Sequence, residues 1–438
     1  MIKILTSALL CLSLITPTWA ADRILLRLHG SNTIGALLAP ELVKAWLKQQ
    51  HYTAISQKTT APQEMLINAT SPSGETVAVT IKAHGSSTSF QALDHEDADV
   101  GMASRPIKAK EVVQLARFGK MDSPESEFVV GLDGIAVIVN RDNPLKLIDK
   151  AVLARIFSGE ISNWSQLGLK SAPIHVYARD DKSGTYDTFK HLVLGKEHPL
   201  TGTAKRFESN ANLSDAVSVD PNGIGFVGLP YVRQSRDLAV SDGGTAAIKP
   251  NPFTVATEDY ALARRLFLYL PQHPSNPVAR DFVEYALSKK GQDVVAESGF
   301  ISQEIISGTA IADVREHPEY QRLIDGAARL SLNFRFHQGS ALLDNKARQD
   351  VKRLVEYLSR NENHGKELIL VGFSDRNEVI PMHSLGLSIQ RADGVADVLI
   401  SEGVAPNKVR GFGPAVIIAA NDTEQGKEKN RRVEVWVR

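Results

Sequence analysis

Residues 174–185 read Ile-His-Val-Tyr-Ala-Arg-Asp-Asp-Lys-Ser-Gly-Thr. The β-branched and aromatic residues at the start of this stretch predict a strand, and the polar residues after it predict a turn into a helix. A helix N-terminus presents unpaired backbone N–H groups and a partial positive charge, so it can hold an anion. Ser183 and Thr185 add hydroxyl donors, and Gly184 lets the backbone come close. The stretch therefore predicts an anion site at a strand-to-helix turn of an α/β fold.

Two other segments share this chemistry, Gly30-Ser31-Asn32-Thr33 and Gly85-Ser86-Ser87-Thr88. Serine, threonine and asparagine are common helix N-caps, so any one segment alone also has a purely structural interpretation. The recurrence favours an oxyanion site. Arg179 stands four residues before Ser183, where its planar guanidinium can hold two oxygens of a tetrahedral anion. We expect Asp181 to orient Arg179 from behind.

The wider pattern up to about residue 300 alternates short apolar runs with amphipathic stretches, which is typical of an α/β architecture. Strands are expected at 24–28, 77–81, 128–140, 174–178 and 224–229, and helices at 34–47 and 278–298. A second pattern follows and predicts a smaller α+β domain with β-α-β-α-β order, at 330–336, 345–360, 367–373, 384–402 and 432–437. We therefore expect domains at 21–305 and 329–438, joined by a linker at 306–328.

The N-terminus has the features of a secretory signal. Lys3 precedes an apolar run at 4–15, and Thr18-Trp19-Ala20 forms a small-residue cleavage site, which predicts a signal peptide at 1–20. The single cysteine, Cys11, lies inside this segment, so the mature chain is expected to have no disulfide. No later stretch is apolar enough to span a bilayer, which predicts a mature chain without a transmembrane segment.

Composition excludes some partners. The 438 residues contain 43% hydrophobic and 23% charged residues, which are values of a globular protein. Lys and Arg number 50, as do Asp and Glu, so no overall field attracts nucleic acid or anionic lipid. Nucleic acid is therefore not an expected partner, and any bound anion must be held by local groups.

Residues 23–305 resemble the phosphate-binding proteins of ABC-type phosphate importers. The resemblance rests on 30–33, 84–87, 99–105, 156–161, 179–185 and 223–226, which follow the family's order. It implies a type 2 periplasmic-binding-protein fold, in which two α/β lobes joined by hinge strands close on a dehydrated anion, and it implies an ABC importer as a partner. The ligand-contacting residues that it implies are Asn32, Thr33, Ser86, Ser104, Arg179, Ser183, Gly184 and Thr185.

Ser104 departs from the family's pattern. Well-known phosphate binders carry an aspartate at this position, which accepts the proton of hydrogen phosphate and repels unprotonated sulfate. A serine cannot reject sulfate by charge. Phosphate is therefore the expected ligand, with sulfate or another oxyanion as the alternative.

Residues 329–438 resemble the OmpA-like peptidoglycan-binding domain, on the strength of 370–375, 387–392, 409–413 and 430–435. The resemblance implies that Asp375 and Arg391 bind the diaminopimelate of the peptidoglycan stem peptide. An Asp and Arg pair matches its ammonium and carboxylate by charge-assisted hydrogen bonds. The alternative is a plain surface salt bridge. The usual Gly-His-Thr-Asp is Gly-Phe-Ser-Asp at 372–375, and the loop at 376–383 also departs from the family's pattern.

An enzyme is the competing class, for example a serine-dependent phosphatase or hydrolase that uses the same cleft. The sequence has no Gly-x-Ser-x-Gly elbow, no His-Glu-x-x-His and no tight cluster of metal ligands, so no catalytic residue, cofactor or metal is predicted. A third possibility is a structural wall-associated protein with a degenerate cleft. We expect a non-enzymatic binding protein, periplasmic and wall-associated, at the outer membrane of a Gram-negative cell envelope.

Overall fold

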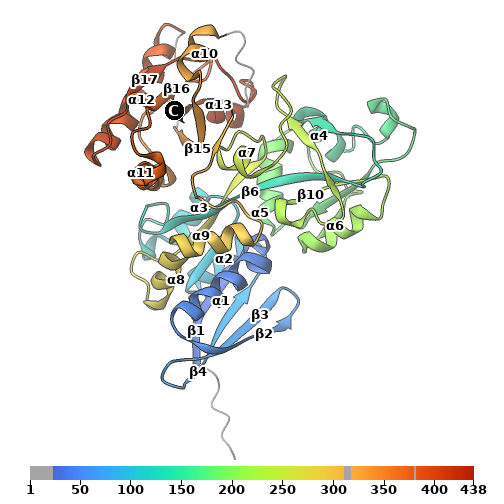
Figure 1. The fold of residues 1–438 in the computed structure, drawn as a ribbon. Helices are drawn as coiled ribbons and strands as arrows, with labels where there is room; N and C mark the ends of the chain where they lie inside the picture. The colour runs from blue at the N-terminus through green and yellow to red at the C-terminus, as the bar shows by residue number, and fades with distance from the viewer. Residues whose placement is uncertain (1–22, 310–316, 337, 379–380) are drawn as a thin grey trace, which may run out of the picture.

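The computed structural model describes residues 23–309, 317–336, 338–378 and 381–438 (Figure 1). The signal peptide expected at 1–20 and Cys11 lie outside the described residues. The observed architecture confirms the predicted α/β class, with a two-lobed N-terminal body and a smaller C-terminal domain of one sheet and helices.

One continuous 11-stranded sheet runs through the N-terminal body, in the order β2-β3-β4-β1-β5-β13-β6-β10-β8-β9, with β11 paired to β6. Lobe 1 contains β1 (Arg23–Gly30), β2 (Thr53–Ala61), β3 (Glu64–Thr70), β4 (Thr76–Lys82) and β5 (Val100–Ala103). Lobe 2 contains β8 (His175–Arg179), β9 (Lys205–Phe207), β10 (Gly223–Gly228), β11 (Arg236–Asp237) and the separate pair β7 (Leu147–Asp149) and β12 (Ala239–Ser241).

Two strands cross from one lobe to the other. The antiparallel pair β6 (Glu127–Val139) and β13 (Ala263–Tyr269) joins lobe 1 through β5 and lobe 2 through β10. These crossing strands are the hinge strands that the family resemblance implied.

Helices cover both lobes. Lobe 1 carries α1 (Ala39–Gln49), α2 (Ser86–Asp94), α3 (Ala109–Gln114), α8 (Val278–Leu287) and α9 (Lys289–Glu297). Lobe 2 carries α4 (Lys150–Phe157), α5 (Gly184–Phe189), α6 (Asn210–Ser218) and α7 (Pro252–Ala256). The single helix expected at 278–298 is two helices, because the chain leaves the helical conformation at Ser288, whose side chain then caps α9.

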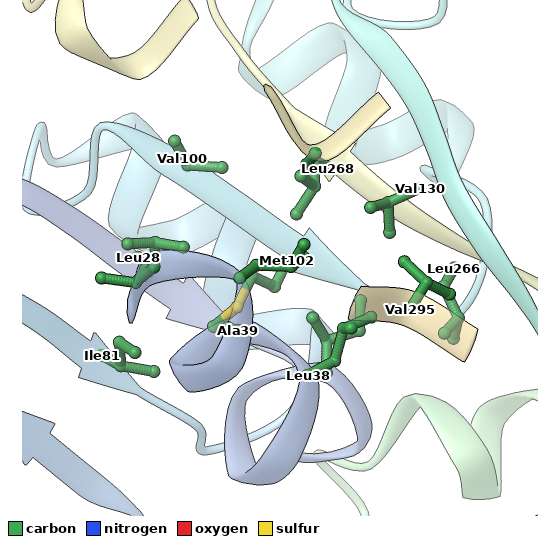
Figure 2. Packing of buried hydrophobic residues seen from close by; sticks show 14 of the residues in the cluster. Leu28, Leu38, Ala39, Ile81, Val100, Met102, Val130, Leu266, Leu268 and Val295 are labelled. Carbon is green, nitrogen blue, oxygen red and sulfur yellow. The ribbon is translucent and has the colours of Figure 1, made fainter. Parts of the chain in front are cut away.

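The core of lobe 1 lies between the sheet and α1 with α9. Figure 2 shows Leu28, Ile81 and Met102 of adjacent strands facing Leu38 and its neighbours at the start of α1. Each fully buried aliphatic side chain contributes about 1.5–3 kcal/mol. The crossing strands enter the same core through Val130, Leu266 and Leu268, so lobe 1 and the hinge form one packed unit (Figure 2).

The C-terminal domain is a sheet of order β14-β15-β18-β16-β17 with helices packed on it. Its elements are β14 (Ser307–Gly308), α10 (Pro318–Ile324), β15 (Ala328–Arg335), α11 (Asn345–Ser359), β16 (Leu368–Gly372), α12 (Pro381–Ser401), β17 (Lys408–Gly411), α13 (Glu424–Asn430) and β18 (Arg432–Val437). Leu332, Leu354 and Val435 belong to its own buried cluster. Figure 1 shows this domain beside α7 and next to β6.

The segment expected as a linker, 306–328, differs from a free connection. Ser307 and Gly308 pair with β15, and α10 places Tyr320 against Phe373, Phe412 and Trp436. The apolar face of α10 explains the difference, since an amphipathic helix buries its face wherever a neighbouring sheet is exposed. Residues 310–316 lie outside the described residues.

Candidate functional site

The three hydroxyl-rich segments lie at strand-to-helix turns, as their sequences predict. Ser183 caps α5, and its Oγ accepts hydrogen bonds from the N–H groups of Thr185 and Tyr186. Gly85 precedes α2, and the segment that starts at Gly30 leads into the helical residues before α1. The first segment and α2 belong to lobe 1 and α5 belongs to lobe 2, so the segments face one another between the lobes.

The predicted ligand residues meet in this interlobe region, and all are buried. Thr33 Oγ1 of lobe 1 lies 3.0 Å from Thr185 Oγ1 of lobe 2. Ser86 Oγ accepts from the Ser104 N–H at 2.9 Å and lies 3.3 Å from Ser104 Oγ. Gly184 lies so close to both serines that a side chain there would overlap their hydroxyls. The lobes therefore stand in a closed arrangement.

Arg179 provides the main positive charge of this region. Its guanidinium is 1% exposed, and burial lowers its pKa to about 10, with Asp180 offsetting part of the effect. Its Nε donates to the Phe207 carbonyl at 3.1 Å, and Nη2 donates to the Glu208 carbonyl and, at 3.4 Å, to Asn32 Oδ1. Nη1 is buried without a hydrogen-bond partner in the structure. A buried guanidinium nitrogen without an acceptor is costly, so this atom calls for an external oxygen.

The expected role of Asp181 is wrong. Its carboxylate is exposed and pairs with Arg206 at 2.6 Å. The Arg179 fork is oriented instead by the carbonyls of Phe207 and Glu208. Asp181 cannot reach Arg179 because the chain turns after β8 and directs the Asp181 side chain into solvent. The neighbour of Arg179 is instead β9, with which β8 pairs.

A second buried arginine, which the sequence analysis missed, lies at the base of the same region. Arg264 of β13 stands opposite Asp133 of β6 in the strand register and binds its carboxylate at 2.6 Å. Arg264 also donates to Thr185 Oγ1 at 2.9 Å and to Thr33 Oγ1 at 3.2 Å. It therefore connects the two lobes through their threonine hydroxyls. The signal in the sequence was the lone carboxylate of Asp133 inside the apolar strand 128–140.

Further polar contacts close the region at its edges. Tyr231 OH donates to the Thr33 carbonyl at 3.0 Å, and Asn210 Nδ2 donates to Asn32 Oδ1 at 3.2 Å. His84 of lobe 1 lies 3.0 Å from both Glu64 of lobe 1 and Glu208 of lobe 2. Partial burial opposes its charge, but the hydrogen bonds to the two carboxylates prevail and raise the pKa of His84.

The predicted peptidoglycan residues of the C-terminal domain are buried and already paired. Asp375 follows β16 and binds Arg431 at 3.1 Å. Arg391 of α12 forms an ion pair with Glu378 and donates from Nε to the Ser340 carbonyl at 3.0 Å. No hydrogen bond or ion pair between Asp375 and Arg391 themselves is recorded among the described residues.

The two pairs form one cluster of alternating charge. Burial alone would lower the pKa of Arg431. The carboxylates of Glu424, Asp375 and Glu378 outweigh burial and raise this pKa. The Arg391 guanidinium carbon lies 5.2 Å from the centroid of the Phe336 ring, and the Phe336 carbonyl accepts a hydrogen bond from Arg431 Nε at 3.3 Å. Glu378 and Arg431 were missed by the sequence analysis. The departing loop at 376–383 was the available signal for Glu378.

Within the described ranges, no helix has the length and apolar character to cross a bilayer, and no group of three or more histidine, cysteine, aspartate or glutamate residues could hold a metal ion.

Comparisons with known proteins agree with this two-part architecture. The model of the PBP superfamily domain matches residues 48–290, and the model of the OmpA family matches residues 335–431. Protein SphX of Synechococcus elongatus is 32% identical over 237 residues, which are 51% of this chain and 69% of the relative. The phosphate-binding protein PstS of Pseudomonas aeruginosa is 31% identical over 242 residues, which are 51% of this chain and 74% of the relative.

Among solved structures, a putative phosphate ABC transporter substrate-binding protein with bound phosphate from Clostridium perfringens is similar to this chain. The TM-score is 0.51 at 26% identity, and the match covers 63% of this chain and 98% of the other.

Proposed function

We propose a function for this chain, which belongs to the PBP superfamily and carries a C-terminal domain of the OmpA family. It is an exported, non-enzymatic protein that binds phosphate or a similar oxyanion between its lobes. Its C-terminal domain attaches to peptidoglycan. The relatives with phosphate in their names support this ligand class. An ABC importer is the partner class that goes with it. The expected leader at 1–20 would direct the chain to the periplasm.

The observation that carries the oxyanion proposal is the unpartnered Nη1 of Arg179. It lies in a buried region that also contains the hydroxyls of Thr33, Ser86, Ser104 and Thr185. Asp133 is bound to Arg264 and accepts the Leu229 N–H at 2.9 Å, so it balances Arg264, while Asp180 lies 3.9 Å from Arg179 Nη2 and offsets only part of the burial of that charge. A buried cation needs a counter-charge, and a tetrahedral oxyanion would supply it.

The test is a calorimetric titration of the full chain with phosphate, sulfate and arsenate. We expect Arg179→Ala to remove detectable binding, because losing one partner of a desolvated charge pair costs about 3–5 kcal/mol. Arg155→Ala is the control, since Arg155 belongs to lobe 2 but is half exposed and pairs with Glu160. Unchanged affinity in Arg179→Ala, with normal thermal unfolding, would sink the oxyanion proposal.

Hydrolysis is the competing activity. Ser183 Oγ accepts two helix N–H groups, and no histidine or carboxylate is recorded as its hydrogen-bond partner in the described part of the chain. These contacts support a capping role over a nucleophilic one. Turnover of a chromogenic phosphate ester that disappears in Ser183→Ala would favour a phosphatase over a binding protein.

For the C-terminal domain, the proposed ligand is the diaminopimelate of the peptidoglycan stem peptide, held by Asp375 and Arg391. Both side chains are buried and paired, so the ligand would replace their internal partners: its carboxylate would take the place of Glu378 at Arg391, and its ammonium that of Arg431 at Asp375. Such an exchange keeps Asp375 and Arg391 paired, while the displaced Arg431 retains Glu424 and the displaced Glu378 retains the hydrogen bond from the Gly339 N–H.

The test is sedimentation of the full chain with purified peptidoglycan. We expect Asp375→Asn and Arg391→Gln each to lose most binding and the double variant little more, because both residues hold one ligand centre. Arg410→Gln is the control, since Arg410 lies exposed on β17 of the same domain. Peptidoglycan with lysine in place of diaminopimelate lacks the second carboxylate and should bind weakly. Equal sedimentation with both kinds of wall would exclude diaminopimelate as the ligand.

A further inference from the structure

The crossing strand β13 presents two neighbouring arginines to opposite sides. Arg264 faces the interlobe region, where it contacts Thr33 and Thr185. Arg265 faces the C-terminal domain, because successive side chains of a strand point to opposite faces. Its guanidinium binds Glu258 Oε1 at 2.6 Å and Asp344 Oδ2, at the start of α11, at 2.7 Å. One strand therefore contacts both the candidate anion site and the C-terminal domain.

Lobe 2 contributes the loop 257–260, which precedes β13, to the same interface. Asp259 binds Arg329 of β15 at 2.7 Å, and neither side chain is more than 2% exposed. Lys429 Nζ donates to the carbonyls of Glu258 and Tyr260, both at 2.8 Å. Glu258 has a φ of 57°, a conformation that disfavours side chains, and these contacts hold it there.

Charges of opposite sign match across this interface. Burial would raise the pKa of Glu258, but Arg265, Lys346 and Arg335 outweigh it and lower that pKa strongly. Burial and the nearby positive charge of Arg335 lower the pKa of Lys429 to about 8. Removing one partner of such a pair leaves an uncompensated buried charge, so the interface resists partial separation.

Asn345, the residue after Asp344, connects the C-terminal domain to lobe 1. Asn345 Nδ2 donates to the Asp122 carbonyl at 3.0 Å and to Glu127 Oε1 at 3.1 Å. The chain that enters the C-terminal domain is also tied to the hinge, since Ile301 pairs with Leu132 of β6 and Gln303 Nε2 donates to the Val129 carbonyl at 2.7 Å. Residues 301–308, all of which the structure describes, therefore lead directly from the hinge to β14 of the C-terminal sheet.

We propose that the C-terminal domain braces the hinge of the N-terminal body, and that Arg265, Asp344 and Asn345 are positioning residues for anion binding. The domain grips lobe 1 at Asp122 and Glu127 and lobe 2 at 257–260, so opening of the lobes must break one set of these contacts. The brace favours the closed arrangement in which Thr33 and Thr185 meet. Its effect on affinity rests on the proposed function. By linkage, anion binding strengthens the docking of the C-terminal domain to the same degree.

The experiment uses the full chain with Asp344→Asn and Asn345→Ala, separately and together. Asparagine keeps the N-cap that Asp344 provides to the Ala347 N–H but removes the charge facing Arg265. Asp149→Asn is the matched control, because Asp149 caps α4 of lobe 2 outside the interface. Sulfate and phosphate affinities are measured by calorimetry. Interlobe distances are measured between spin labels at Lys58→Cys and Lys170→Cys, two exposed positions, in a chain with Cys11→Ser.

We expect the double variant to bind the anion about tenfold more weakly, which is about 1.4 kcal/mol. We also expect a broader interlobe distance distribution without anion, and behaviour like the parent for Asp149→Asn. A parent-like affinity and distance distribution in the double variant would overturn the brace. If the double variant does not fold, the single Asn345→Ala, which removes no charge, carries the same test. If the parent chain binds neither anion, the proposed function fails, and the distance distributions alone still test the brace.

Discussion

Ser104 bears most directly on which oxyanion the cleft selects. It is fully buried beside Ser86 and Gly184, and we propose that its hydroxyl contacts a ligand oxygen. A hydroxyl can donate or accept, and it therefore suits protonated and unprotonated oxyanions alike. The carboxylate of Asp133, at the base of the same region, is bound to Arg264.

Replacing Ser104 with aspartate should sharpen the preference for phosphate over sulfate. The new carboxylate accepts a hydrogen bond from hydrogen phosphate but repels sulfate, which has no proton to offer. The measurement is the ratio of the two dissociation constants in the parent and in Ser104→Asp, with Ser104→Ala as the uncharged control. An unchanged ratio would place Ser104 outside the ligand shell.

His84 should make lobe closure depend on pH. Its hydrogen bonds to Glu64 and Glu208 raise its pKa above the usual 6.5, so the charged imidazolium links the lobes. The stabilisation of the closed lobes by the charged His84 side chain is complete below its ordinary pKa. This stabilisation is lost as the pH rises through the raised pKa. Sulfate affinity should therefore fall over that window and stay level in His84→Gln. Sulfate is the suitable probe because it stays doubly charged there. Parallel pH profiles of the two proteins would refute this role.

At the scale of elements, the loop between β16 and α12 determines how Arg391 meets a ligand. Glu378 of this loop binds Arg391 and also accepts the Gly339 N–H at 2.8 Å. In the proposed mode of binding, the stem-peptide carboxylate replaces Glu378 at Arg391. The family resemblance located Arg391 on the helix but could not locate its partner.

Glu378→Gln should strengthen wall binding several-fold, because a neutral amide competes less well than a carboxylate for the guanidinium. The measurement is the peptidoglycan concentration that sediments half of the full chain, compared with Glu424→Gln, which removes the exposed carboxylate from Arg431. Weaker binding in Glu378→Gln, with unchanged thermal stability, would instead make Glu378 a support that orients Arg391 for its ligand.

At the scale of the whole molecule, each module has its own buried cluster, and the ionic interface joins them. Two cores alone would unfold independently. With the brace, an anion that stabilises the N-terminal body also stabilises the docked C-terminal domain.

Sulfate or phosphate at one hundred times its dissociation constant should stabilise the body by about 2.7 kcal/mol. In a calorimetric scan of the full chain, the transition of the C-terminal domain should rise together with that of the body. Arg179→Ala should show neither shift on adding the anion. If only one of two transitions moves in the parent chain, the modules are thermodynamically independent.

The amino-acid sequence by itself determined the α/β class, the two-module order and the strands and helices with strong apolar patterns, because their signals are local. Alternation within 330–336 and helical spacing within 345–360 each depend on a few neighbouring residues. Polar strands gave no such signal: the exposed β2 was not predicted. The residues of the candidate anion site could be named from the family resemblance, and the three hydroxyl-rich segments were indicated by their own turn sequences.

Only the tertiary structure decided which charges pair. Arg264 and Asp133 are 131 positions apart in the chain, and Arg329 and Asp259 are 70 apart. Asp181, which we expected to orient Arg179, instead forms an ion pair with Arg206. A charged side chain can pair with any opposite charge that the fold brings within a few ångströms, and local sequence does not restrict that choice. The hinge brace follows from the same fact, because it exists only where two separately predicted domains meet.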